Sequence, residues 1–211
     1  MRKLSSLEKA AIASATREAE RRSHGEIVTV IAPSSDEYHA VILLWSALAS
    51  LLVPGLFLLL NKFQVIEYAD LRIVYVTQLF VFLLLLALLR IPLILRRAIP
   101  SKLRRLCVQR AAQMQFYQHQ LQHTQYRCGI LLYVSLLERR VELLADKGIN
   151  DRVAPATWQR ITDNFITQVR RDEIKAGFVQ AIEACGAVLA QHFPADGTTA
   201  NELADELVEV K

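Results

Sequence analysis

Two long apolar segments without a charged residue limit what this chain can fold into. The first extends from Val41 to Leu60, and the second extends from Ile73 to Leu89. A helix of about 20 residues is about 30 Å long, which matches the hydrocarbon thickness of a bilayer. A chain of 211 residues has too little other structure to bury two helices that are apolar all round. The sequence therefore predicts a hairpin of two transmembrane helices.

The second apolar segment is the shorter one and is followed by Arg90 and the sequence IPLIL. It reaches spanning length if the Arg90 side chain extends toward the interface. We therefore expect a transmembrane helix over residues 41–60, an external loop over residues 61–72 and a second transmembrane helix over residues 73–95.

Basic residues predict the orientation of this hairpin. Six basic residues and no acidic residue lie between residues 95 and 113, whereas the external loop holds two residues of each sign. By the positive-inside rule, both termini are cytoplasmic. The net charge of +4 thus reflects topology and does not indicate nucleic-acid binding. The basic residues that we expect to contact anionic lipid headgroups are Arg96, Arg97, Lys102, Arg104 and Arg105.

The segment before the first apolar helix, residues 1–38, is predicted to contain a helix and a strand. Ser5 and Glu8 have the spacing of a capping box ahead of an alanine-rich helix. Its small-residue face suits close packing against a sheet. The sequence EIVTVIA, over residues 26–32, then has the β-branched composition of a strand.

The segment GILLYVSLLERRVELLAD, which begins at Gly129, is predicted to form a β-hairpin. Nine uncharged residues suffice for a strand but not for a bilayer span, and charges then alternate with apolar residues. Because both alternating faces of its first strand are largely apolar, we expect helices to cover both faces of the sheet. The turn is placed at residues 137–140.

The rest of residues 101–193 is predicted to be helical on either side of this hairpin. A helix from Ser101 to about Gln122 precedes it, and two helices beginning near Trp158 and Asp172 follow it. Residues 195–211 form an acidic tail in which we expect at most a short helix. The fold class is therefore α/β: a small sheet covered by helices and interrupted by the two-helix transmembrane hairpin.

The sequences LSSLEKAAIASATREAERRSHGEIVTVIA and GILLYVSLLERRVELLADKGINDRV resemble the two halves of the TPM domain family. More closely, the chain resembles the bacterial subgroup in which a two-span insertion interrupts this domain. The resemblance implies a small sheet with helices on both faces and a bacterial inner-membrane location. Some members are acid phosphatases with a metal near acidic loop residues, but MRKL replaces the acidic stretch that usually precedes the first helix.

Asp146, Asn150 and Asp151 lie together at the exit of the predicted hairpin. Their oxygens could hold Ca²⁺ or Mg²⁺. Asp36 and Glu37 could join them from the end of the first strand or could equally be solvated charges beside the membrane. The alternative is turn formation and helix capping, for which Asp and Asn are favoured. Because Ca²⁺ requires roughly six to eight oxygen ligands, we favour capping.

Two other pairs of polar residues have ordinary interpretations. His119 and His123 are four residues apart and would share a helix face, but a metal site needs further ligands. Arg139 and Arg140, which could bind phosphate, are more simply solubilising residues at a turn. The sequence also lacks a glycine-rich phosphate loop and a nucleophile elbow.

These observations favour a protein-interaction or assembly module at the cytoplasmic face of the membrane over an enzyme. Its expected partners are the lipid bilayer and a membrane protein, and self-association into a homo-oligomer is a further alternative. The competing hypothesis is a metal-assisted phosphatase that acts on phosphomonoesters through Asp146 and Asp151.

Overall fold

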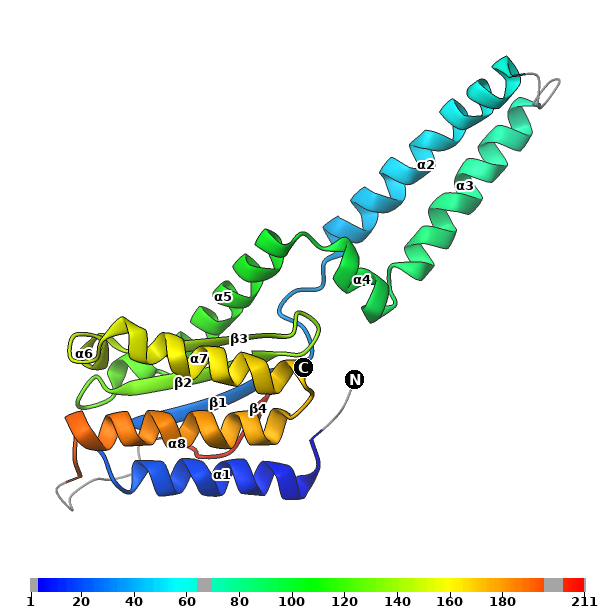
Figure 1. Ribbon diagram of the computed structural model, residues 1–211. Coiled ribbons are helices and arrows are strands. Elements are labelled where there is room, and N and C mark those ends of the chain that lie inside the picture. The colour runs from blue at the N-terminus through cyan, green and yellow to red at the C-terminus, as the bar shows by residue number, and fades with distance from the viewer. Residues whose placement is uncertain (1–3, 64–69, 196–202, 211) are drawn as a thin grey trace. The chain divides into compact units, whose positions relative to one another are not determined.

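Two strands from opposite sides of the apolar insertion pair in parallel at the centre of one sheet. The computed structural model describes residues 4–63, 70–195 and 203–210. These divide into an α/β unit, residues 1–36 and 104–211, and a helical insertion, residues 37–103. Figure 1 shows the elements of both, and each unit is described by itself.

The sheet of the α/β unit has the strand order β3-β2-β1-β4 among the described residues, and its last strand, β4, is Val208–Glu209. The two central strands, β1 (Glu26–Ala32) and β2 (Gly129–Ser135), are parallel, with Glu26 opposite Gly129 and Ala32 opposite Ser135. The predicted hairpin is confirmed, because β3 (Arg140–Ala145) runs antiparallel to β2 after a turn at residues 136–139. All seven residues of both central strands are buried, as expected for strands covered on both faces.

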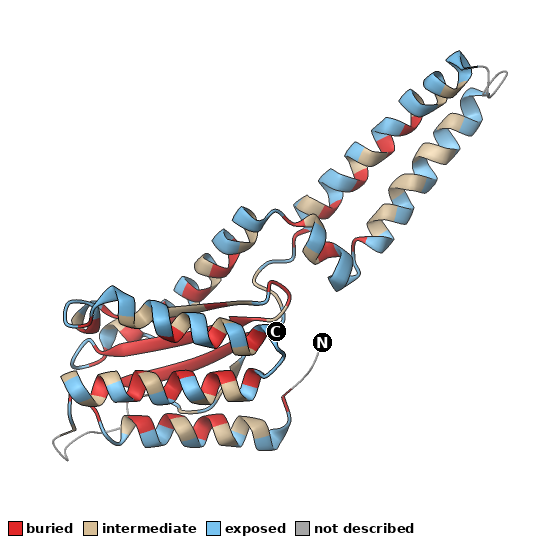
Figure 2. Ribbon diagram, viewed as in Figure 1, coloured by how far each residue is buried: buried red, intermediate tan, exposed pale blue. Residues whose placement is uncertain are grey.

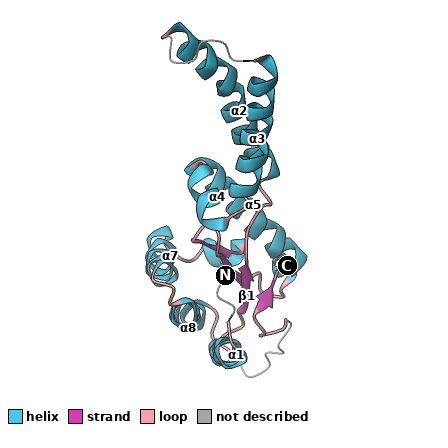
Figure 3. Ribbon diagram, turned by 90° about the vertical axis from the view of Figure 1, so that its right-hand side faces the viewer, coloured by secondary structure: helices cyan, strands magenta, loops and turns pink. Residues whose placement is uncertain are grey.

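Helices cover both faces of this sheet, which confirms the prediction from the alternating apolar residues (Figure 3). On one face, Ile27, Ile130 and Leu132 pack with residues of α1 (Ser6–Glu20), α7 (Pro155–Arg170) and α8 (Ile174–His192). We call this the α8-side core. On the other face, Val28, Leu131 and Tyr133 pack with α5 (Ser101–Gln118) in the α5-side core. Figure 2 shows both central strands as buried throughout.

Helix α1 keeps its predicted capping box, since the Ser5 side chain accepts from Glu8 N–H and Glu8 reaches back to Ser5 N–H. Its small-residue face, expected to lie against a sheet, packs chiefly against α8 instead. A β-carbon at Gly186 of α8 would lie 2.7 Å from Cβ of Ala19. The small residues thus allow two helices to approach closely.

The helical insertion contains α2 (His39–Lys62), α3 (Leu71–Leu88) and α4 (Pro92–Ala98). The helix that was expected over residues 73–95 is wrong as a single element, because α3 ends at Leu88 and α4 begins anew at Pro92. Proline lacks an N–H, and its ring clashes with the carbonyl four residues earlier, which here belongs to Leu88. Pro92 instead occupies the first turn of α4, where no N–H partner is needed.

Helices α2 and α3 pack against each other with most of their apolar side chains exposed (Figure 2). The buried residues of α2 are Ile42, Ser46, Ser50 and Val53, and none of the residues of α3 is buried. Their spacing of three or four places them on one side of α2. Small serines on this side allow close packing, and their hydroxyls donate back to the helix carbonyls of Ile42 and Ala47.

Two further elements differ from the sequence prediction. Helix α5 ends at Gln118, before the 3₁₀ turn η1 (Leu121–His123), and not at about Gln122. The tail forms a strand, β4 (Val208–Glu209), instead of a short helix, because the edge of β1 supplies hydrogen-bond partners that an isolated segment lacks. Residues 64–69 of the predicted loop and residues 196–202 of the predicted tail lie outside the described residues.

Replacing Gly186 by Val should destabilise the α/β unit, because the new β-carbon would overlap with Ala19. Overpacking of this kind costs about 1–3 kcal/mol. Ala187→Val is the matched control, since Ala187 is the next residue of α8 and is exposed. The control should cost no more than about 0.7 kcal/mol through helix propensity. Thermal unfolding of the full chain in detergent measures both, and equal losses would contradict the packing argument.

Candidate functional site

The carboxyl ends of the parallel strands β1 and β2 meet at one end of the sheet, which is where α/β proteins commonly bind ligands. Residues 33–36 follow β1, and the turn at residues 136–139 follows β2. Backbone hydrogen bonds join the two segments, because Leu136 N–H donates to Ala32 O and Leu137 N–H donates to Pro33 O, each at 3.0 Å. Polar side chains from both segments therefore come together here.

A buried carboxylate, Glu138, is the centre of this polar cluster. Only 3% of its surface is exposed. Its Oε1 accepts from Ser35 N–H at 3.1 Å and from Ser34 Oγ at 3.4 Å, and its Oε2 accepts from Ser135 Oγ. A buried carboxylate is tolerated when such donors replace its water. The cluster therefore fixes the chain at the point where it leaves β1 for the helical insertion.

Two further contacts extend the cluster toward the α5 side of the sheet. The Tyr133 hydroxyl lies 3.0 Å from Ser35 Oγ, and Cys107 Sγ on α5 donates to Asp36 Oδ2 at 3.3 Å. Burial raises the pKa of Tyr133, and the Glu138 charge adds to this, so the phenol stays neutral at physiological pH. The donors to Glu138 all come from the chain itself, which makes this end of the sheet an internal anchor.

Sequence reasoning missed the Glu138 cluster and interpreted this residue as part of an ordinary turn. The signal lay in Tyr133 and Ser135, two polar residues on an otherwise apolar strand face. What the sequence did not reveal was that β1 and β2 are parallel. Only this pairing places Ser34 and Ser35 beside a residue about a hundred positions later in the chain.

The predicted site residues Asp146, Asn150 and Asp151 lie at the opposite end of the sheet, on or beside α6 (Lys147–Asn150). Asp146 is the N-cap of α6: its Oδ1 accepts from Lys147 N–H at 2.7 Å, while its Oδ2 forms an ion pair with Arg127 Nε at 3.0 Å. Asn150 Nδ2 donates to Ala145 O at 2.7 Å, and Asp151 is the exposed C-cap. The favoured interpretation of Asp146 as a cap is confirmed.

This arrangement is poorly suited to a cation, because both carboxylate oxygens of Asp146 already have donors. Asp36 and Glu37 had two open interpretations, as members of this group or as solvated charges near the membrane, and Asp36 does not join the group. Asp36 follows the carboxyl end of β1, whereas Asp146 follows the end of β3 that pairs with Ile130 at the start of β2. Among the described residues, no group of three or more His, Cys, Asp and Glu lies close enough to hold a metal ion.

The two histidines do not share a helix face as expected. Helix α5 ends at Gln118, and Gln120 has a left-handed backbone with φ of 54°, so His123 lies in η1 beyond a change of direction. Burial lowers the pKa of His119. Arg139, which also has a positive φ of 49°, is exposed in the turn after β2, as expected for a solubilising residue.

The basic residues that were predicted to bind lipid occupy the end of α4 and the start of α5. Arg97 and Lys102 are exposed, whereas Arg96 and Arg104 are half-buried. Arg105 is exposed. Burial raises the pKa of Glu142 on β3, and the positive charge of Arg105 partly opposes this rise. Arg97, Lys102 and Arg105 are therefore the exposed members of the set.

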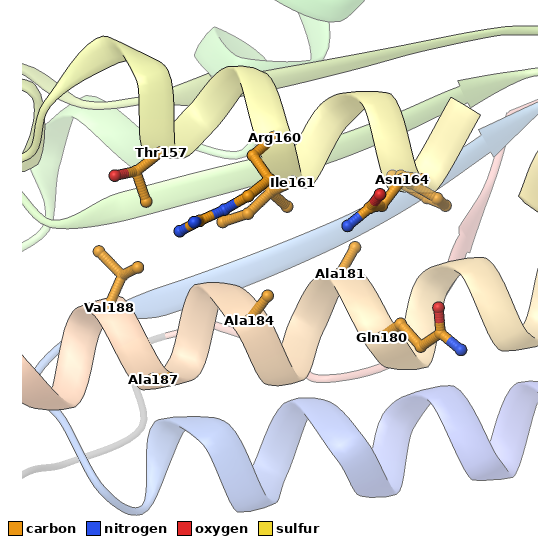
Figure 4. Close-up of a pocket in the computed structure, with 10 residues that line it drawn as sticks. Thr157, Arg160, Ile161, Asn164, Gln180, Ala181, Ala184, Ala187 and Val188 are labelled. Carbon is orange, nitrogen blue, oxygen red and sulfur yellow. The ribbon is translucent and has the colours of Figure 1, made fainter. Parts of the chain in front are cut away.

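A shallow groove of about 310 Å³ lies between α7 and α8 (Figure 4). Alanines of α8, including Ala181 and Ala184, line it together with Ile161 of α7. Arg160 and Asn164 extend from α7 over the groove toward α8. It is an exposed surface feature with mixed chemistry and without a convergent set of titratable groups.

Glu20, at the end of α1, is a largely buried carboxyl group with a strongly raised pKa. Its Oε1 accepts from Ile27 N–H at 2.8 Å. Burial raises the pKa of Glu20 to about 9, and the neighbouring carboxyl groups of Asp205 and Glu26 act in the same direction. Asp205 also lies 3.6 Å from Arg17 Nε, which links α1 to the C-terminal segment.

Two comparisons with known proteins agree with this architecture, and a third gave nothing. Residues 101–188 match the model of the family described as the TPM domain. The solved NMR structure of the BA42 protein from the psychrophilic bacterium Bizionia argentinensis is similar, with a TM-score of 0.62 and 20% identity over 99% of this chain and 97% of that one. No curated protein matches. Residues 101–188 are therefore similar to the TPM domain family, and the α/β fold of the chain is similar to that of the BA42 protein.

Among the described helices, α2 and α3 are long and apolar enough to cross a membrane. The most apolar 18-residue stretch of each has a mean hydropathy of 2.3. Only 17% of this stretch in α2 and 6% of it in α3 is buried. The predicted apolar hairpin is therefore present as two packed helices.

Glu138→Ala should destabilise the protein, because the buried hydroxyl of Ser135 and the amide of Ser35 would lose their acceptor, whereas the Ser34 hydroxyl keeps its hydrogen bond to Asp36 O at 2.6 Å. Each buried donor that is left without an acceptor lowers the free energy of unfolding by about 1–3 kcal/mol. Glu138→Gln keeps one carbonyl oxygen and should lose less than Glu138→Ala. Chemical denaturation of the full chain in detergent compares them, and an unchanged midpoint for Glu138→Ala would contradict the anchoring role.

Glu20→Gln should stabilise the protein at pH 8 and have little effect near pH 5. The folded state keeps a proton on Glu20 up to a pKa of about 9, whereas the unfolded carboxyl releases it near 4.5. The free energy of unfolding therefore falls as pH rises from about 4.5 to about 9. Gln carries no titratable proton, so Glu20→Gln removes this loss. A gain on the order of 1 kcal/mol would raise Tm by roughly 2–4 °C.

Glu18→Gln on the same helix is the control for this pH dependence. The Arg22 hydrogen bond and charge lower the pKa of Glu18, so its substitution should give no gain at pH 8. Melting curves of both variants from pH 5 to pH 9 test the assignment. Equal pH dependence of Glu20→Gln and the unmodified protein would refute it.

Proposed function

We propose that the protein is a membrane-tethered interaction module that belongs to the bacterial TPM subgroup with a two-span insertion. Helices α2 and α3 are the membrane anchor, and the α/β unit lies at the cytoplasmic face of the inner membrane with both chain termini. The observation that carries this proposal is the apolar surface that α2 and α3 leave exposed when they pack against each other.

The extent of this exposure argues for lipid contact. Leu52 and Leu58 of α2 are 72% and 71% exposed, and Val76 of α3 is 68% exposed. Contiguous apolar patches above a few hundred Å² are rare on soluble monomers. Each large aliphatic side chain gains about 1.5–3 kcal/mol when it is removed from water. A bilayer removes all of them from water together.

The basic residues support the proposed orientation. Arg97 and Lys102 are exposed after the second apolar helix, where cytoplasmic anionic headgroups would attract them. We propose the same role for Arg96, Arg104 and Arg105, with Arg105 shared between lipid and Glu142.

The distribution of polar groups favours interaction over catalysis. The buried carboxylate Glu138 and the cap Asp146 both have their donors within the chain. The exposed features are instead surfaces that another protein would contact, including the α7–α8 groove. We therefore propose a membrane protein as the partner, with self-association as the alternative.

Photo-crosslinking in native bacterial membranes tests the proposal, with a photoreactive residue in place of Asn164 beside the groove or of the exposed Ala10 on α1. We expect a discrete protein adduct with the full chain. Leu51→Arg combined with Leu79→Arg should release the protein from alkaline-washed membranes and abolish the adduct. Each arginine near the bilayer centre costs about 2.5–3.5 kcal/mol on insertion scales.

Leu7→Arg is the matched control, because Leu7 is 82% exposed on α1 of the α/β unit. This variant should remain in the membrane and keep the adduct. Release of the unmodified protein by alkaline washing would refute the anchor. Hydrolysis of a phosphomonoester that is lost in Asp146→Ala with Asp151→Ala would instead support the metal-assisted phosphatase.

A further inference from the structure

The C-terminal segment, residues 203–210, lies along the edge of β1 that faces away from β2. Val208 and Glu209 form β4 opposite Val30 and Ile31, and Val210 N–H donates to Ile31 O at 3.0 Å. This pairing is parallel and covers two of the seven residues of β1. The chain thus places its own extended segment where a partner's strand would add to the sheet.

The apolar side chains of this segment alternate between the two faces of the sheet. Leu207 packs against the α8-side core, whereas Val208 and Val210 pack against the α5-side core. This is the alternation of a strand, with successive side chains on opposite faces. The edge therefore has places for aliphatic side chains on both faces.

Two basic residues of α1 meet two acidic residues of the segment. Lys9 Nζ lies 2.8 Å from Glu209 Oε2, and Arg17 Nε lies 3.6 Å from Asp205 Oδ2. The basic pair on α1 therefore meets two carboxylates that are four residues apart in the sequence of the segment. Val208 and Glu209 of this segment are strand, and the chain bends at Glu206. Glu206, between the two carboxylates in the sequence, is exposed.

The segment is held weakly by these contacts. The ladder is short, and the side chains of the Lys9–Glu209 pair are 37% and 47% exposed, so solvent screens their attraction. Farther along the edge, the Ile27 N–H donates to the Glu20 side chain. Attachment to the same chain supplies an effective concentration of about 1 mM for short linkers, which favours the internal segment.

We propose that the β1 edge and the basic pair Lys9 and Arg17 form a docking site for an extended acidic–aliphatic segment of a partner protein. The partner's segment carries two carboxylates four residues apart and aliphatic residues that alternate around them. The chain's own residues 203–210 occupy the site until the partner displaces them. This inference rests on the proposed function and assigns the surface through which the module acts.

The probe is a labelled peptide, LADELVEV, which copies residues 203–210. It is titrated against the full chain in nanodiscs by fluorescence anisotropy. Glu209→Lys combined with Val210→Pro weakens the internal segment, because it removes the Lys9 ion pair and the donor to Ile31 O. We expect this variant to bind the peptide at least about tenfold more tightly than the unmodified chain, since internal competition is relieved.

Matched peptides show whether binding is specific. The first peptide carries the change that corresponds to Glu206→Lys and should bind like the original peptide. The second carries the change that corresponds to Glu209→Lys and should bind at least about fivefold more weakly. When Lys9→Glu is added to the variant with the weakened internal segment, the protein should bind the Glu209→Lys peptide more tightly than the original peptide. No binding by the weakened variant, or equal effects of the two charge changes, would overturn the docking site.

Crosslinking in membranes separates this inference from the function on which it rests. The weakened variant should give more partner adduct, and Lys9→Glu with Arg17→Glu should give less. An adduct that is unaffected by these variants would overturn the docking site while leaving the interaction module intact. A dimer detected by light scattering that depends on Lys9 and Glu209 would show a second copy as the occupant and overturn the partner assigned here.

Discussion

The parallel pairing of β1 with β2 is the interaction on which the rest of this structure depends. It joins two segments that are separated by the whole helical insertion, so the α/β unit forms only when the chain returns from that insertion. The pairing buries both strands completely and creates the two faces on which the helices pack. Non-local pairing of this kind carries a loop-closure cost, which the apolar residues on both faces offset.

The same pairing gives the two ends of the sheet different chemistry. At the carboxyl ends, Glu138 collects donors from the loop after β1 and anchors the point where the insertion begins. At the other end, Asp146 caps α6 and pairs with Arg127. Both carboxylates are thus satisfied internally, which leaves the sheet edge and the helix surfaces for recognition. The proposed module and its docking edge follow from that distribution.

Much of the fold could be predicted because it depends on local pattern. The alternation from Ile130 to Ser135 indicated a strand covered on both faces, and Ser5 with Glu8 indicated a capped helix, as observed. The cap at Asp146 followed from residue type alone. The Glu138 cluster and the acidic neighbourhood of Glu20 could not be predicted, because each joins residues far apart in the chain.

The sequence by itself determined where apolar helices, capped helices and buried strands occur, since these depend on the periodicity and length of nearby residues. Only the tertiary structure decided which ends of the strands meet and which polar groups face each other. It brought Asp36 to Cys107 and away from Asp146, and it paired the acidic C-terminal segment with the edge of β1. The physical reason is that strand direction and edge pairing are set by contacts between distant segments, which no local pattern specifies.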